Sequence, residues 1–124
     1  MLVIDANYIL RWFLNDIEEQ ASAVDTLLKT ADSESIFIDR VTIAEITYVL
    51  RAKSYDHHQI YRIFEEIYYY PSVQSPTSLD GTAQELYRDT TLDFEDCVLI
   101  AHQKVNKYSV GTFDKAINKL IEKP

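Results

Sequence analysis

Residues 1–14, MLVIDANYILRWFL, contain the pattern on which the fold depends: three apolar residues, one acid, and then a helical sequence. Leu2–Ile4 has the length and composition of a short strand, and a helix is expected to begin at Ala6-Asn7. The apolar residues are continuous rather than alternating, which favours a strand buried on both faces, as in a parallel sheet. Asp5 stands at the junction between the strand and the helix.

The same succession of strand and helix recurs along the chain. Short apolar runs predict further strands at Ile36–Ile38, Ser72–Gln74 and Tyr108–Gly111. Apolar residues at helical spacing predict helices that cover residues 17–31, 43–50, 60–68, 78–91, 94–105 and 115–121. Strands that alternate with helices are typical of an α/β fold with a parallel sheet. In such sheets functional groups gather beyond the carboxyl ends of the strands, where Asp5 and Asp114 lie.

The composition predicts a single domain over residues 1–124. Hydrophobic residues make up 47% of the chain, enough for a core, and no linker, repeat or low-complexity segment interrupts it. No apolar run approaches the about 20 residues that a transmembrane helix needs, and the N-terminus lacks the features of a signal peptide. The single cysteine, Cys97, excludes an intrachain disulfide and fits a reducing compartment. We therefore expect a cytoplasmic protein that does not associate with membranes.

The net charge of −8 argues against a protein that holds nucleic acid through a broad basic face. It does not exclude nucleic-acid chemistry, because metal ions in a cleft can supply the positive charge that faces a phosphate. The acidity also suits a basic protein partner. The sequence has no Cys/His spacing for zinc, no phosphate-binding glycine loop and no nucleophile elbow, which argues against the enzymes built on those motifs.

Five acidic residues stand where apolar runs break, and each has two interpretations: Asp5, Glu45, Asp93, Asp96 and Asp114. The first interpretation is a cap that satisfies free N–H groups at the start of a helix. The second is a shared metal site. Clustered carboxylates repel one another, and proteins that gather them usually bind divalent metal for phosphoryl chemistry.

Asp5 and Asp114 each follow a predicted strand and precede a predicted helix, so both interpretations stay open for them. Asn7 could cap the first helix in place of Asp5. Thr112 could donate a hydrogen bond to a carboxylate or to a phosphate.

The other three acids differ in how well capping explains them. Glu45 lies three residues after Thr42, the spacing of a capping box, which favours a cap. Asp93 is a candidate N-cap. Asp96 lies on a helix that is apolar on most sides, so its carboxylate loses solvation, which favours a ligand role.

Four segments resemble, in order and approximate spacing, the sequence blocks of PIN domains, specifically the VapC-type toxin branch. The first is VIDANYILR at residues 3–11, and the second lies within residues 37–51 and contains VTIAEI. The third is DFEDCVLIA at residues 93–101, and the fourth is GTFDK at residues 111–115. Asp39 departs from the family, which often carries a small or neutral residue there.

This resemblance implies a three-layer α/β/α PIN-like fold with a short central parallel sheet flanked by helices. It implies a metal-dependent endoribonuclease that is the toxin of a type II toxin–antitoxin pair, with a cognate antitoxin as partner and a homodimer as the assembly. The implied cofactor is Mg²⁺ or Mn²⁺, and the substrate is RNA. The implied catalytic residues are Asp5, Glu45, Asp96 and Asp114. The implied metal ligands are Asp5, Asp93, Asp96 and Asp114, with Asn7 and Thr112 in supporting positions.

Three alternatives remain: a catalytically degenerate PIN-like binding module, a Mg²⁺-dependent phosphatase or phosphotransfer domain, and a structural α/β domain whose acids are caps. The intact acids count against the first. Asp5-Ala6-Asn7 has neither the adjacent acids of a receiver domain nor the Asp-x-Asp of a haloacid-dehalogenase-like phosphatase. Arg11 and Arg51 match family positions, but structural salt bridges are an equally good expectation for both.

Overall fold

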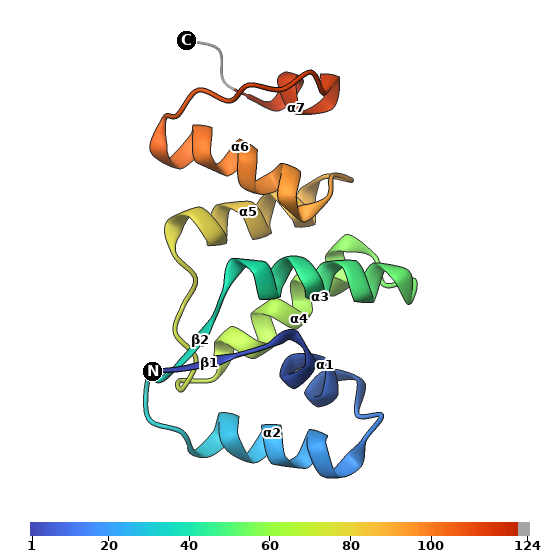
Figure 1. Cartoon of the computed structure of the whole chain (residues 1–124), viewed down its shortest axis with the longest axis vertical. Coiled ribbons are helices and arrows are strands. Elements are labelled where there is room, and N and C mark those ends of the chain that lie inside the picture. Colours follow the sequence, from blue (N-terminus) through green and yellow to red (C-terminus); the bar gives the residue numbers. More distant parts are fainter. Residues whose placement is uncertain (122–124) are drawn as a thin grey trace. The chain divides into compact units, whose positions relative to one another are not determined.

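The computed structural model describes residues 1–121, and the chain divides into two compact units, residues 1–75 and residues from 76 onward. Residues 122–124 of the predicted single domain lie outside the described residues. Residues 1–121 contain two strands and seven helices (Figure 1), which confirms the predicted α/β class with its short parallel sheet. The first unit contains β1 (Leu2–Ile4), α1 (Ala6–Leu14), α2 (Glu18–Thr30), β2 (Ile36–Ile38), α3 (Arg40–Ala52) and α4 (His57–Tyr69). The second contains α5 (Ser78–Asp89), α6 (Phe94–Asn106) and α7 (Lys115–Leu120).

The sheet of the first unit is short and parallel. Leu2 pairs with Ile36, and the register continues to Ile4 opposite Ile38. On the other side of β2, Val73 forms a single parallel bridge to Ile36, so the strand predicted at 72–74 pairs at one position only. In Figure 1 α2 lies below the two strands and α3 lies above them.

Apolar faces of the four helices form the core of the first unit. α1 packs on α2 and on α3, and α3 packs on α4. Ile9, Leu28, Ile46 and Ile60 are almost completely buried. α4 begins at a complete capping box with Asp56 as N-cap, and its core face follows the helical spacing predicted for residues 60–68.

Helices are the only regular secondary structure in the described part of the second unit. α5 packs on α6, and α6 on α7, with Tyr87 and Phe94 in an edge-to-face contact 6.2 Å between ring centroids. α5 is capped by Thr77, directly before the helix that the sequence predicts from residue 78. The predicted strand at 108–111 is wrong, because these residues have no regular secondary structure. A strand requires a hydrogen-bonded neighbour, and residues 76–121 contain no strand that could pair with them.

Candidate metal centre

Asp5 lies directly after β1 and caps α1. Its Oδ1 accepts a hydrogen bond from the Tyr8 N–H at 3.0 Å, so Asp5, and not Asn7, is the cap. Within residues 1–121 its Oδ2 takes part in no hydrogen bond. Both Asp5 and Asn7 are exposed. One carboxylate oxygen is therefore held by the helix and the other faces solvent, where it could bind a cation.

Glu45 is not part of a capping box, so that interpretation is wrong. α3 begins at Arg40, and its N-cap is Asp39, whose Oδ1 accepts from the Val41 N–H at 2.8 Å. Thr42 therefore lies inside the helix, and Glu45 projects from its second turn as an exposed side chain. The correct cap had a signal in the sequence, because Asp39 directly follows the strand Ile36–Ile38. With the cap assigned elsewhere, helix capping no longer explains the acid at position 45.

Asp93 and Asp96 lie at the start of α6. Asp93 occupies the N-cap position but makes no capping hydrogen bond with its side chain. Asp96 is half-buried in the first turn. Burial raises the pKa of Asp96 above its ordinary value, and the negative charges of Asp93 and Asp114 raise it further. Asp93 and Asp114 are thus both close enough to Asp96 to repel its negative charge.

Asp114 caps α7 through one oxygen. Its Oδ1 accepts from the N–H groups of Ala116 at 2.8 Å and Ile117 at 3.0 Å. The Thr112 hydroxyl in turn accepts from the Asp114 N–H at 3.1 Å. The sequence analysis did not single out Asn118, whose side-chain amide donates to the Thr112 carbonyl at 3.1 Å. This local network fixes the orientation of the Asp114 carboxylate.

The predicted acids are divided between the two units. Asp5 and Glu45 belong to the first, and Asp93, Asp96 and Asp114 belong to the second. Among residues 1–121, no three His, Cys, Asp or Glu side chains form a group that could hold a metal ion. The absence of such a group is compatible with the effect of Asp93 and Asp114 on the pKa of Asp96. Electrostatic repulsion acts over longer distances than direct coordination of a metal ion. In the second unit Asp93 and Asp114 therefore act on Asp96 electrostatically, and within residues 1–121 the three do not form a coordination shell.

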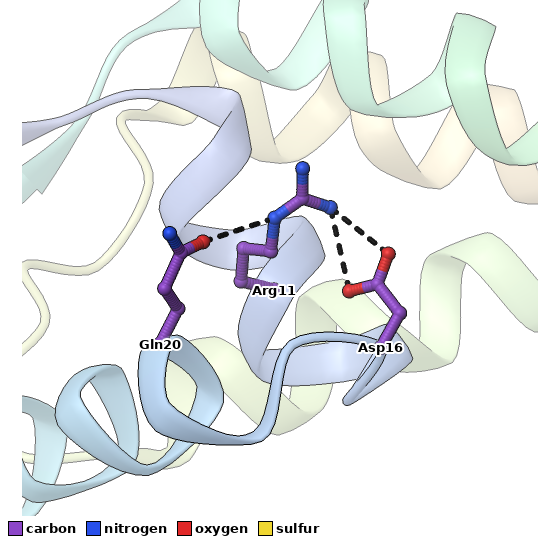
Figure 2. A network of polar contacts seen from close by, with 3 residues as sticks. All are labelled: Arg11, Asp16 and Gln20. Atoms are coloured by element: carbon purple, nitrogen blue, oxygen red, sulfur yellow. Dashed lines mark hydrogen bonds and ion pairs between the residues drawn. The ribbon is translucent and has the colours of Figure 1, made fainter.

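Arg11 and Arg51, the two cations at family-matching positions, both have structural partners. Arg11 forms an ion pair with Asp16 at 3.0 Å and donates from Nε to the Gln20 side chain at 3.2 Å (Figure 2). The salt bridge expected for Arg11 is therefore confirmed. Arg51 instead donates to the Tyr55 carbonyl at 2.9 Å.

The described residues form a mixed α/β fold with acidic N-caps on several helices, an arrangement compatible with metal-assisted chemistry on phosphates. Comparison with models of protein families matches the PIN domain over residues 2–123. The chain therefore belongs to the PIN-domain family. PIN domains are generally nucleases that need divalent metal ions. No curated protein and no solved structure matched the chain. No helix within residues 1–121 is long and apolar enough to cross a membrane.

Proposed function

We propose that the protein is a Mg²⁺- or Mn²⁺-dependent endoribonuclease and the toxin of a type II toxin–antitoxin pair. Membership of the PIN family supports hydrolysis of nucleic acid. The four blocks that resemble VapC-type toxins support RNA as the substrate. The catalytic acids in this proposal are Asp5, Glu45, Asp96 and Asp114.

The observation that carries the proposal is the repulsion that the charges of Asp93 and Asp114 exert on the partly buried Asp96. Gathering carboxylates costs free energy, since each charge disfavours ionisation of its neighbours. Within residues 1–121 none of the three forms an ion pair with a cationic side chain, and the Asp114 carboxylate accepts hydrogen bonds only from N–H groups at the start of α7. A divalent cation would relieve this repulsion. Metal binding would therefore explain why these three acids lie near one another, which helix capping alone does not.

The donor set fits a hard divalent cation. Mg²⁺ and Mn²⁺ favour carboxylate oxygen and water, and the proposed ligands Asp5, Asp93, Asp96 and Asp114 offer only carboxylate oxygens. When bound, such an ion supplies positive charge against the phosphate and lowers the pKa of water.

The chain's own residues have separate roles in this proposal. Asp5 and Asp114 present carboxylates that helix N–H groups have already oriented. Glu45, exposed and not engaged in capping, orients the attacking water and accepts its proton. Asn7 and Thr112 support the first and last acids, and Thr112 does so through its contact with the Asp114 N–H.

We further propose a cytoplasmic homodimer whose partner is a cognate antitoxin. The net charge of −8 suits an antitoxin with a basic segment, since opposite charges speed and orient association. Native co-expression with the neighbouring gene tests this part of the proposal. A small basic protein that copurifies supports it, and purification of the chain alone would count against it.

The nuclease activity is tested by the substitutions Asp5→Asn and Asp96→Asn, with Glu95→Gln as the matched control in the same helical turn as Asp96. Asn caps a helix about as well as Asp, so Asp5→Asn should keep the α1 cap. Both Asn variants should lose Mn²⁺-dependent cleavage of single-stranded RNA while circular dichroism stays unchanged, and Glu95→Gln should still cleave. Cleavage at the unmodified protein's rate by both Asn variants would refute the metal site. A severe loss of melting temperature in EDTA would instead show that the two carboxylates are needed for folding, which would count against a role confined to metal binding.

A further inference from the structure

The first unit contains a groove between α1 and α2 that extends beyond the residues proposed for the metal chemistry. The groove has a volume of about 670 Å³, within the range of sites for small organic ligands. All its lining residues lie between positions 5 and 27, so the groove is complete within this unit. Asp5 is one of these residues, which places the groove beside a proposed catalytic acid.

The lining combines an apolar surface with an available aromatic ring. α2 contributes Ala23, Val24 and Leu27, and α1 contributes Tyr8 and Asn7. The Tyr8 side chain is 47% exposed although it borders the groove. Unpaired nucleobases bind proteins by stacking on aromatic rings while their edges form hydrogen bonds. The groove therefore suits a flat ligand with a polar edge.

The polar side of the groove presents donors held in position. Arg11 Nη1 donates to both Asp16 carboxylate oxygens, at 3.0 and 3.3 Å, and its Nε donates to Gln20 Oε1 (Figure 2). Within residues 1–121, Arg11 Nη2 and Gln20 Nε2 form no hydrogen bond. Because Asp16 offsets its charge, Arg11 is a weak anchor for a phosphate but remains a donor of fixed direction.

We propose that the groove between α1 and α2 binds one unpaired RNA nucleobase adjacent to the scissile phosphate and so contributes to sequence preference. The neutral base is favoured over a phosphate because Arg11 is already paired with Asp16. The two remaining donors favour a base with acceptors on its edge, and a purine such as guanine offers these acceptors together with a large stacking surface. This inference rests on the proposed nuclease function and names the part of the substrate that the groove recognises.

The test blocks the groove without altering its polar residues. Ala23→Phe adds a ring at an exposed position of α2 that lines the groove, and Ser22→Phe adds the same ring at the exposed neighbour that does not. In EDTA, titration of the labelled full-length protein with 5′-GMP should shift the amide signals of Asn7, Tyr8 and Gln20. Ala23→Phe should weaken this binding by about tenfold, because the added ring occupies the groove and keeps the base from stacking there. Stacking supplies most of the affinity for a single base. Ser22→Phe should bind like the unmodified protein, and 5′-UMP should bind more weakly than 5′-GMP.

Cleavage mapping on a randomised single-stranded RNA with Mn²⁺ gives the second measurement. The unmodified protein and Ser22→Phe should share a base preference beside the cut, and Ala23→Phe should cleave without that preference. Equal 5′-GMP binding and equal preference in both Phe variants would overturn the inference while leaving the nuclease proposal intact. Signal shifts with a basic peptide but none with 5′-GMP would also overturn it. Binding of 5′-GMP in the groove without RNA cleavage would support the groove assignment and contradict the proposed nuclease.

Discussion

Replacing Asp96 with Asn is expected to stabilise the protein when no divalent metal is present. Burial and the charges of Asp93 and Asp114 raise the pKa of Asp96 in the folded chain. An acid with a raised folded-state pKa holds more protons when folded than when unfolded. The stability of the unmodified protein should therefore fall as the pH rises from the ordinary carboxylate pKa through the higher folded-state value. Asn has a similar shape and no charge, so the variant lacks this loss.

The expected gain is modest because Asp96 is only half-buried and water screens the repulsion. Interactions between exposed charges contribute about 0.2–1 kcal/mol each, and two neighbouring acids therefore give about 1 kcal/mol. In a domain of this size, that corresponds to a rise in melting temperature of about 3–5 °C. Loss of a carboxylate from a first helical turn acts in the opposite direction, by about 0.3–1 kcal/mol. The comparison therefore needs a control that shares this second effect.

Glu95→Gln is that control, because Glu95 is an exposed acid in the same turn of α6 and does not raise the pKa of Asp96. Thermal unfolding at pH 7 in EDTA should place the melting temperature of Asp96→Asn above that of Glu95→Gln. The difference should disappear in acid, where the carboxylate is protonated. Added Mg²⁺ should stabilise the unmodified protein and not Asp96→Asn, since ligands stabilise only the state that binds them. A melting temperature of Asp96→Asn at or below that of Glu95→Gln in EDTA would refute the repulsion.

Three further predictions concern caps and the buried thiol. Asp39→Ala should lower the free energy of unfolding, measured in urea, by about 1 kcal/mol, because Asp39 caps α3. Glu45→Gln should change this free energy by less than about 0.5 kcal/mol. A larger loss for Glu45→Gln than for Asp39→Ala would instead support a capping box at Glu45. Asp56→Ala should cost about 1–2 kcal/mol by removing the capping box of α4, with RNA cleavage unchanged at a temperature where the variant stays folded. Burial raises the pKa of Cys97 to about 11. The folded protein should therefore react slowly with a thiol reagent at pH 8, and the unfolded protein should react rapidly. Fast reaction of the folded protein would contradict the burial of Cys97.

The helices could be predicted where the apolar spacing is unbroken. In α4, Ile60, Ile63, Phe64 and Ile67 follow helical spacing, and all four are buried. Helix starts were harder to predict, because several residues near one start have side chains that can cap. Asp39 and Thr42 both fit the start of α3 by composition, and only the extended backbone and the bond to Val41 identify Asp39.

Non-local features set the limit of sequence reasoning. The apolar run at Tyr108–Gly111 predicts a strand, but strand formation depends on a partner that the run itself does not encode. The acids could be chosen from the sequence because each interrupts an apolar run or belongs to a family block. The effect of Asp114 on the pKa of Asp96 could not be predicted from the sequence, because it depends on how α6 and α7 pack. The groove between α1 and α2 likewise arises only once the two helices pack together.

Helix capping and metal binding, which the sequence presents as competing roles, are compatible for Asp5 and Asp114. Each caps its helix with Oδ1 alone, so the second oxygen is available to a ligand. The bond to the helix also fixes the side-chain rotamer, which lowers the entropy that metal binding would otherwise cost. Asp93 and Glu45 have no such bond and would lose more conformational freedom on binding. The two caps are therefore the pre-organised members of the proposed ligand and catalytic set.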